Sequence, residues 1–205
     1  MMLQEYLFRT ALMELGMEPT ELHVNHLTGE IRLGDHVFGL KYPVEYVRRI
    51  DELPLERKYR YVFSGSTEAH GNRLEALEAF QGPNSHLETN LYGRNETTKY
   101  TFNVEYYSLL RSSYFSLCPH QAYWPGPKEL AWTYRFIESA FSKTLPIVFR
   151  KLPCGKRFLD GFEFFWDDEE HDLKDYEEKL EHNRKLAEER FLISLKEQQT
   201  LGGKR

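Results

Sequence analysis

Two side chains, Arg135 and Glu138, have the types and the spacing that ligand chemistry would need. They stand three positions apart in residues 128–143, a segment with the periodicity of an amphipathic helix. An arginine can donate two hydrogen bonds to a diphosphate, and a carboxylate three residues further on can accept hydrogen bonds from both hydroxyls of a ribose. The simpler interpretation is a surface ion pair worth about a few tenths of a kcal/mol. Spacing alone leaves both interpretations open.

The apolar face of this helix indicates which way the pair points. Four apolar residues recur at i, i+4, i+7 and i+11, so they should pack on a sheet and leave Arg135 and Glu138 on one flank. They are Leu130, Tyr134, Ile137 and Phe141. The pair is therefore expected beside the sheet, just after the loop at residues 118–128.

The sheet itself is predicted from short apolar runs that alternate with helical patterns. Strands are expected at residues 59–63, 86–92, 114–118 and 146–149, and helices at 71–80, 104–112 and 128–143. This alternation is typical of an α/β fold with a doubly wound, parallel, Rossmann-like sheet. Ligands of such sheets bind outside the carboxyl ends of the strands. The loops expected there are residues 64–72, 118–128 and 149–155.

The remaining segments predict a small appendage before the α/β domain and a long helix after it. Residues 1–55 should hold a helix at 3–15, a hairpin within 21–40 and a short helix from Pro43 to Ile50. The hairpin turns are expected at Thr28-Gly29 and Gly34-Asp35. The α/β domain should span residues 56–170, with a short strand or apolar tail at 162–166. Residues 171–205 should form a charged helix, from about 172 to 198, that packs on this domain.

Composition excludes several classes of function. The formal net charge is -5, with acid concentrated in residues 167–172, so we expect no nucleic-acid partner. The sequence has neither a signal peptide nor about eighteen consecutive apolar residues, which predicts a cytoplasmic protein without a membrane span. Cys118 and Cys154 are expected to be free thiols, and His23 and His26 should lie on opposite faces of a strand, so no metal site is predicted. The acidic run is expected to be a solvated cap at the N-terminus of the long helix.

The order of several motifs resembles the donor-binding half of exostosin-type glycosyltransferases. In that family a helix ending in Arg-x-Ser leads to a strand ending in Leu-Cys-Pro, a glycine-containing loop, an Arg-x-x-Glu-Ala helix and a Pro-Val-Val strand. Within residues 110–148 this chain has Arg-Ser-Ser, Leu-Cys-Pro, Arg-Phe-Ile-Glu-Ser-Ala and Pro-Ile-Val in the same order. Before the last strand it has Ser-Lys-Thr-Leu where the family usually has glycine. The resemblance covers about residues 59–166, and extends more distantly to the donor half of fucosyltransferases, which share the GT-B plan.

This resemblance implies one half of a GT-B fold that binds a nucleoside-diphosphate sugar. The sugar would pass to a hydroxyl acceptor, such as a carbohydrate, without a metal or another cofactor. Arg135 would bind the donor diphosphate and Glu138 the ribose, while Arg111 would brace a helix–strand corner. The loop at residues 121–127 is bulkier than in the family, and in it Tyr123 or Trp124 would stack on the base or the sugar, or else serve ordinary packing. The matched loops would complete the donor site with Gly65, Ser66, Cys118, Pro119 and His120.

The catalytic base has no secure assignment in the sequence. Four residues are candidates by chemical type, although a lone histidine is more often structural. They are His26, Asp35, His36 and His70. Only residues 1–55 precede the α/β domain, too few for a complete acceptor domain. An alternative is therefore a non-catalytic nucleotide-sugar or carbohydrate-binding or assembly module, to which a second copy of the chain or another partner chain would supply an acceptor site. A doubly wound domain of unrelated enzymatic purpose fits the architecture as well.

Overall fold

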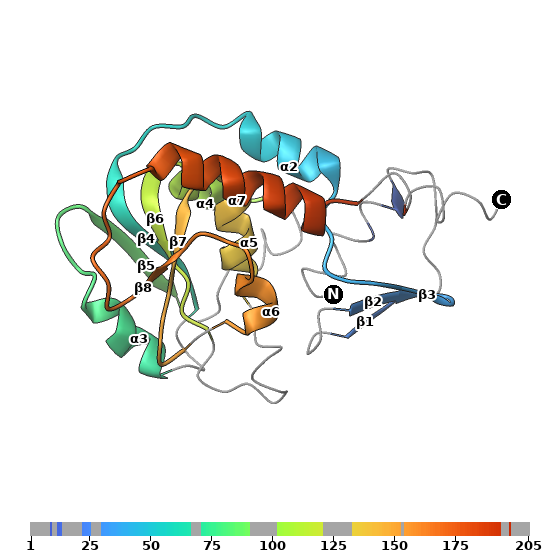
Figure 1. The fold of residues 1–205 in the computed structure, drawn as a ribbon, viewed down its shortest axis with the longest axis horizontal. Helices are drawn as coiled ribbons and strands as arrows, with labels where there is room; N and C mark the ends of the chain where they lie inside the picture. The colour runs from blue at the N-terminus through green and yellow to red at the C-terminus, as the bar shows by residue number, and fades with distance from the viewer. Residues whose placement is uncertain are drawn as a thin grey trace.

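A five-stranded parallel sheet forms the centre of the fold (Figure 1). The computed structural model describes residues 9, 12–13, 22–25, 30–66, 71–90, 102–120, 133–152, 154–193 and 197. The strands of this sheet are β4 (Tyr59–Ser66), β5 (Ser85–Asn90), β6 (Ser113–Leu117), β7 (Leu145–Val148) and β8 (Phe165–Trp166). Their order is β5-β4-β6-β7-β8, and every neighbouring pair is parallel. The chain runs from β4 to β5 and then crosses to β6 on the other side of β4, so the strand order switches between β4 and β6.

Helices cover both faces of the sheet, which confirms the doubly wound α/β prediction. They are α2 (Val44–Asp51), α3 (Gly71–Glu78), α4 (Val104–Arg111), α5 (Tyr134–Phe141), α6 (Lys156–Leu159) and α7 (Tyr176–Phe191). Val62 and Phe63 of β4 point to opposite faces, and each belongs to a different hydrophobic cluster. The Val62 cluster includes side chains of α2, α4 and α5, whereas the Phe63 cluster includes side chains of α3 and the start of α7. All residues of β7 are buried, as expected for a parallel strand covered on both sides.

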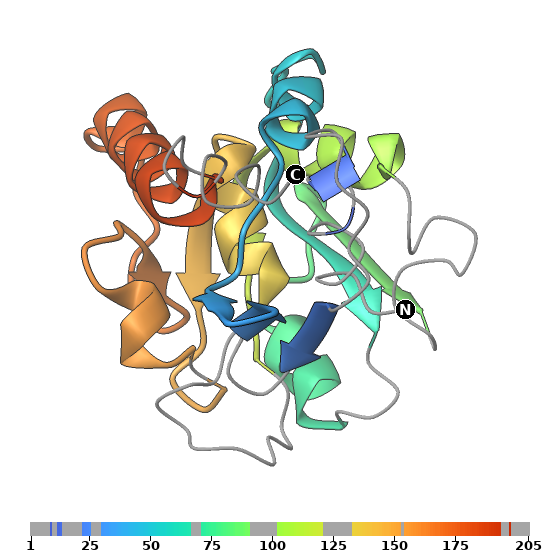
Figure 2. The same cartoon turned by 90° about the vertical axis from the view of Figure 1, so that its right-hand side faces the viewer.

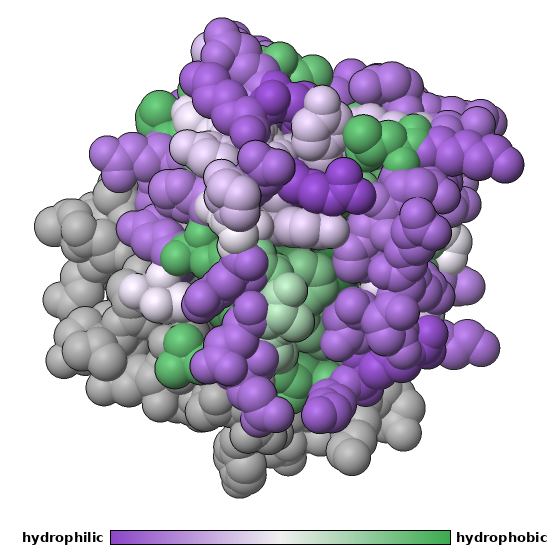
Figure 3. Space-filling view, turned by 90° about the vertical axis from the view of Figure 1, so that its left-hand side faces the viewer, coloured by the Kyte–Doolittle hydropathy of each residue, from purple (hydrophilic) through white to green (hydrophobic). Residues whose placement is uncertain are grey.

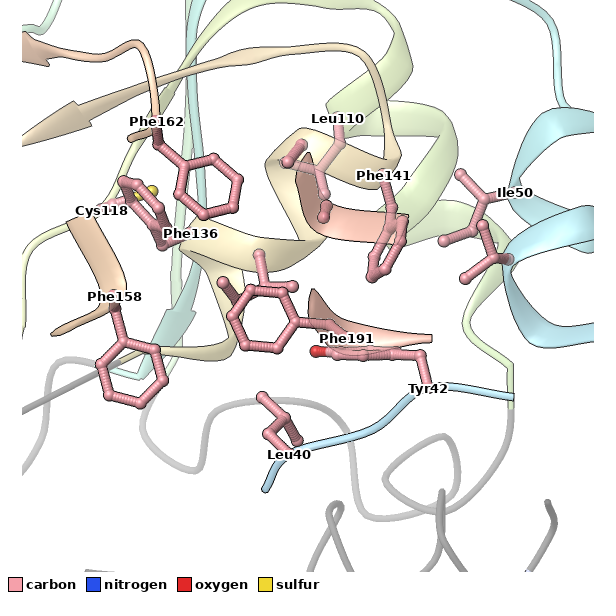
Figure 4. Close-up of a cluster of buried hydrophobic side chains, with 14 of the residues drawn as sticks. Leu40, Tyr42, Ile50, Leu110, Cys118, Phe136, Phe141, Phe158, Phe162 and Phe191 are labelled. Atoms are coloured by element: carbon pink, nitrogen blue, oxygen red, sulfur yellow. The ribbon is translucent and has the colours of Figure 1, made fainter. Parts of the chain in front are cut away.

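The end of α7 is joined to the segment that precedes α2. The backbone N–H of Tyr42 donates a 2.6 Å hydrogen bond to the carbonyl oxygen of Phe191. The Tyr42 ring also packs edge-on against Phe141 of α5, with 5.1 Å between the ring centroids. Figure 4 shows Leu40 and Tyr42 beside Phe191 in this cluster. The segment just before α2 and the end of α7 therefore belong to one hydrophobic core.

A separate antiparallel sheet precedes these elements in the chain (Figure 2). It contains β1 (Leu22–Asn25), β2 (Glu30–Leu33) and β3 (His36–Phe38), paired in that order. The predicted turn between β2 and β3 is confirmed, and Gly34 there has a φ of 56°, a conformation that favours glycine. Helix α2 begins directly after Pro43, as predicted, because proline suits the start of a helix. The predicted turn at residues 28–29 and most of the predicted helix at 3–15 lie outside the described residues.

The acidic run at residues 167–172 does not cap the long helix, contrary to the prediction. Helix α7 begins only at Tyr176. The run instead surrounds Arg150, in the turn after β7: Asp168 approaches its Nε at 2.7 Å and Glu169 its Nη2 at 3.5 Å. A full positive charge at this range attracts a carboxylate more strongly than the partial charge of a helix terminus.

The described part of the face drawn in Figure 3 is mainly hydrophilic. Figure 3 shows one face on which hydrophilic side chains surround a narrow band of hydrophobic ones. The exposed large hydrophobic residues belong to different elements, among them Val37, Val44, Leu74, Val104 and Leu173. Within the described part of the chain, every helix is too short or too polar to cross a bilayer.

Candidate functional site

Arg135 lies at the carboxyl edge of the parallel sheet, where the strand order switches. It is the second residue of α5, and its side chain reaches the end of β4. Its Nη2 donates a 2.5 Å hydrogen bond to the carbonyl oxygen of Ser64, and its guanidinium carbon lies 4.2 Å from the ring centroid of Phe63. The aromatic face stabilises the cation. The structure therefore places this predicted residue at the edge where open parallel sheets bind ligands.

Gly65 provides the space that the Arg135 guanidinium occupies. A Cβ atom built on Gly65 would collide with Nη2 of Arg135. A larger residue would force the guanidinium away from β4. The family resemblance implies that this glycine belongs to the donor site, and in the structure an arginine side chain fills the space beside it.

Arg73 is a second arginine at the same edge, and the sequence analysis did not select it. It lies in α3, and its Nη1 donates a 2.6 Å hydrogen bond to the Ser66 carbonyl oxygen. Its Nη2 donates a 3.2 Å hydrogen bond to the carbonyl oxygen of Pro119, just after β6. Arg73 therefore joins the ends of the two strands that flank the switch in strand order. Its position directly after the predicted loop 64–72 is the signal that could have identified it.

The charges of these two arginines are not balanced by acids. Arg73 and Arg135 are only 6% and 9% exposed. Within the described ranges, neither forms an ion pair with an aspartate or glutamate, and the Nε of each has no hydrogen-bond partner. Burial, together with the positive charge of Arg135, lowers the pKa of Arg73 to about 10. Buried charges are normally paired, so this edge of the sheet is suited to an anion.

Glu138 lies one turn after Arg135 but is completely buried. Its Oε2 accepts a 2.7 Å hydrogen bond from the Tyr106 hydroxyl, and its Oε1 accepts a 3.1 Å bond from the Tyr107 hydroxyl. The Tyr107 hydroxyl is in turn 3.0 Å from that of Tyr46. Glu138 therefore links α5 to α4 and α2. A ribose could reach the carboxylate only if this packing opened.

The burial of α5 bears on the two interpretations of Arg135 and Glu138 that their spacing leaves open. Every residue from Arg135 to Phe141 is buried, so α5 has no exposed flank. The interpretation of Arg135 and Glu138 as a surface ion pair is therefore excluded, and their side chains bond to different elements. The physical reason is that Arg135 packs against the end of β4 and Glu138 against α4, two elements distant from α5 in the sequence.

The predicted loop after β6 lies next to Arg73. The Pro119 carbonyl oxygen accepts the Arg73 bond, and the His120 backbone N–H donates a 2.9 Å bond to the Leu152 carbonyl oxygen. Cys118 is a buried free thiol, and burial raises its pKa to about 11. At neutral pH this residue is therefore protonated and contributes packing rather than a nucleophile.

The other candidates lie in the separate antiparallel sheet or outside the described residues. Asp35 lies at the turn after β2 and His36 is the first residue of β3, both in the separate antiparallel sheet. His26, His70 and Tyr123 lie outside the described residues. Within the described ranges, there is no group of three or more histidines, cysteines or acids that could hold a metal ion.

A hollow of about 440 Å³ opens at the opposite edge, between the ends of α2, α4 and α5 and the side of α7. Charged residues line it, but most are matched: Arg184 binds Asp51 at 2.7 Å, and Lys143 binds Glu181 at 2.5 Å. Arg111 hydrogen-bonds to carbonyl groups at the end of α2 and so joins α4 to α2. This hollow is a structural junction, unlike the edge near Arg135.

Fold and site together define a doubly wound α/β protein with two buried arginines at the switch in its strand order. No model of a protein family and no curated protein matches the sequence. Among solved structures, the chain is similar to AviGT4, a glycosyltransferase involved in avilamycin A biosynthesis, with a TM-score of 0.43 and 13% sequence identity. The match covers 83% of this chain and 56% of that structure, so the chain spans little more than half of AviGT4.

Proposed function

We propose that this protein is a glycosyltransferase-like protein that binds a nucleoside-diphosphate sugar at the carboxyl edge between β4 and β6. The observation that carries this proposal is the buried Arg135 guanidinium, which has no acidic partner among the described residues and lies at the switch in strand order. A diphosphate would supply the missing negative charge and could accept two parallel hydrogen bonds from the guanidinium. The motif order that resembles exostosin-type enzymes supports the choice of a nucleotide sugar over other phosphorylated ligands.

In the proposed reaction, Arg135 stabilises the diphosphate that leaves as the sugar is transferred. Negative charge develops on the leaving oxygen as its bond to the sugar breaks, and a fixed guanidinium in a water-poor site stabilises that charge effectively. The acceptor hydroxyl would lose its proton to a base that the described residues do not identify. The resemblance also gives Glu138 a bond to the ribose, which would require one tyrosine hydroxyl to release the carboxylate.

A non-catalytic binding module is the second candidate, and one observation favours it. In the described part of the chain, the residues before β4 form a small antiparallel sheet and α2 rather than a second parallel α/β unit. GT-B enzymes react in the cleft between two such units. An acceptor site would then have to come from another chain or a second copy of this one.

Two measurements on the full chain test the proposal. Calorimetric titration with uridine and guanosine diphosphate sugars should show binding that Arg135→Met weakens by about 10-fold or more, because a charge-assisted pair of bonds is lost. Arg32→Met on β2 is the matched control, since it removes one exposed positive charge from the separate sheet. Incubation with the same nucleotide sugars distinguishes the two candidates, because an enzyme would slowly release free nucleoside diphosphate and a binding module would release none. If no nucleotide sugar binds the wild-type chain, the proposed function is rejected.

A further inference from the structure

Arg73 and Arg135 bring two positive charges from different helices to one edge of the sheet. Their guanidinium carbons lie 6.0 Å and 4.2 Å from the ring centroid of the same residue, Phe63. Both side chains are more than nine-tenths buried. Two like charges so placed repel each other with little screening by water. The arrangement therefore destabilises the chain unless something negative lies between the arginines.

The hydrogen bonds that these arginines make do not require positive charge. Arg73 donates to the carbonyl oxygens of Ser66 and Pro119, and Arg135 donates to that of Ser64. An uncharged amide side chain could donate to a carbonyl oxygen with a much smaller penalty for leaving water. A purely structural role thus explains the bonds but leaves both charges unexplained.

We propose that Arg73 and Arg135 together bind one dianionic phosphate group, and that Arg73 is a ligand-binding residue in its own right. The Nε–H of each guanidinium is buried and lacks a partner among the described residues, so each has an unmet hydrogen bond that a phosphate oxygen could accept. An anion between the two would neutralise both charges, and each guanidinium would retain its bonds to the strand ends. That the ligand is a diphosphate rests on the proposed function. The two-arginine site itself requires only a phosphate dianion.

Inorganic pyrophosphate is the probe that tests the two-arginine site separately from nucleotide recognition. Calorimetry would compare pyrophosphate, uridine diphosphate and guanosine diphosphate on the wild-type chain and on Arg73→Met. We expect Arg73→Met to weaken pyrophosphate binding by about 10- to 100-fold, and the exposed-charge control Arg32→Met to change it by less than about 2-fold. Arg73→Gln keeps an amide donor for the carbonyl oxygens and loses the charge, so it decides the question if Arg73→Met does not fold.

Each outcome bears differently on the two proposals. Weaker binding of pyrophosphate and of a nucleoside diphosphate to the Arg73 variants supports both. If Arg73→Met or Arg73→Gln binds nucleoside diphosphates as tightly as the wild-type chain does, the role of Arg73 is overturned while the proposed function stands. Pyrophosphate binding that depends on Arg73, without any nucleotide binding, supports the two-arginine site and rejects the proposed function. A wild-type chain that binds none of the three overturns both.

Discussion

Arg135 at the start of α5 donates a 2.5 Å hydrogen bond to the Ser64 carbonyl oxygen near the end of β4, across the neighbouring Gly65. This bond places a buried positive charge at the switch in strand order of a parallel sheet. Arg73 approaches the same edge from α3. Anion binding would explain why both positive charges lie there although no acid among the described residues pairs with them.

Replacing Gly65 with alanine should displace Arg135. The added Cβ would push the guanidinium away from the Ser64 carbonyl oxygen, and because this buried charge would lose its bond we expect a loss of about 1–3 kcal/mol in the free energy of unfolding. Urea unfolding measures this. Gly82→Ala is the matched control, because a Cβ at Gly82 would meet nothing within 4 Å. Equal stabilities of the two variants would show that Arg135 moves aside freely.

Glu138→Ala should reduce stability because it removes the carboxylate that accepts hydrogen bonds from the hydroxyls of Tyr106 and Tyr107. Losing buried hydrogen bonds to a charged group costs about 1–3 kcal/mol, and Glu138→Gln should lose less because it keeps one acceptor oxygen. The proposed bond to ribose is tested with the same variants. If Glu138→Gln binds pyrophosphate normally but nucleoside diphosphates more weakly, Glu138 contacts the nucleoside; equal effects on both ligands would contradict that contact.

Arg184 should be important for holding α7 in place. It binds the Asp51 carboxylate of α2 at 2.7 Å and donates a 2.5 Å bond to the Phe141 carbonyl oxygen of α5, and it is largely buried. Because Arg184→Met removes both bonds, including the buried one to the Phe141 carbonyl oxygen, we expect a loss of about 1–3 kcal/mol in thermal unfolding experiments. Arg48→Met, which breaks only exposed pairs on α2, should have no measurable effect. A comparable loss in both variants would contradict this role for Arg184.

Cys118 and Cys154 should resist alkylation in the folded protein. Burial raises the pKa of Cys118 from 9.0 to about 11 and raises that of Cys154 as well, so both remain protonated at about pH 8. Mass spectrometry after iodoacetamide treatment should find both thiols unmodified until denaturant is added. Since the folded-state pKa of Cys118 is raised, its contribution to stability is complete below pH 9 and is lost as the pH rises toward 11. Rapid modification of the native chain at about pH 8 would contradict the burial of these thiols.

Much of the fold was predictable because it depends on local patterns. The alternation of apolar runs with helical stripes predicted β4 to β7 and the helices between them, because a parallel strand buried on both faces has a nearly continuous apolar sequence. The turn at Gly34 and the helix start after Pro43 were also predictable from residues with restricted or unusual backbone preferences. The observed boundaries of these strands and helices differ from the predicted ones by a few residues. The single turn of α6 has no clear sequence pattern that predicts it.

The site was only partly predictable because it depends on contacts between distant segments. Arg135 could be selected from its motif, yet the burial of Glu138 depends on contacts with Tyr106 and Tyr107 of α4, about thirty positions earlier. Arg73 looks like an ordinary polar residue of an amphipathic helix, and only its contact with Pro119 distinguishes it. The acidic run at residues 167–172 was assigned to the nearest helix in sequence, whereas Arg150 is the nearer charge in space.

The most direct test of the central claim is a thermal shift measurement on the wild-type chain and on Arg135→Met, with uridine and guanosine diphosphate as ligands. A ligand that binds only the folded state raises the melting temperature by mass action. The account predicts a concentration-dependent rise for the wild-type chain with at least one of the two, and little or none for Arg135→Met. An unchanged melting temperature of the wild-type chain with both diphosphates, or an equal rise in the variant, would contradict it.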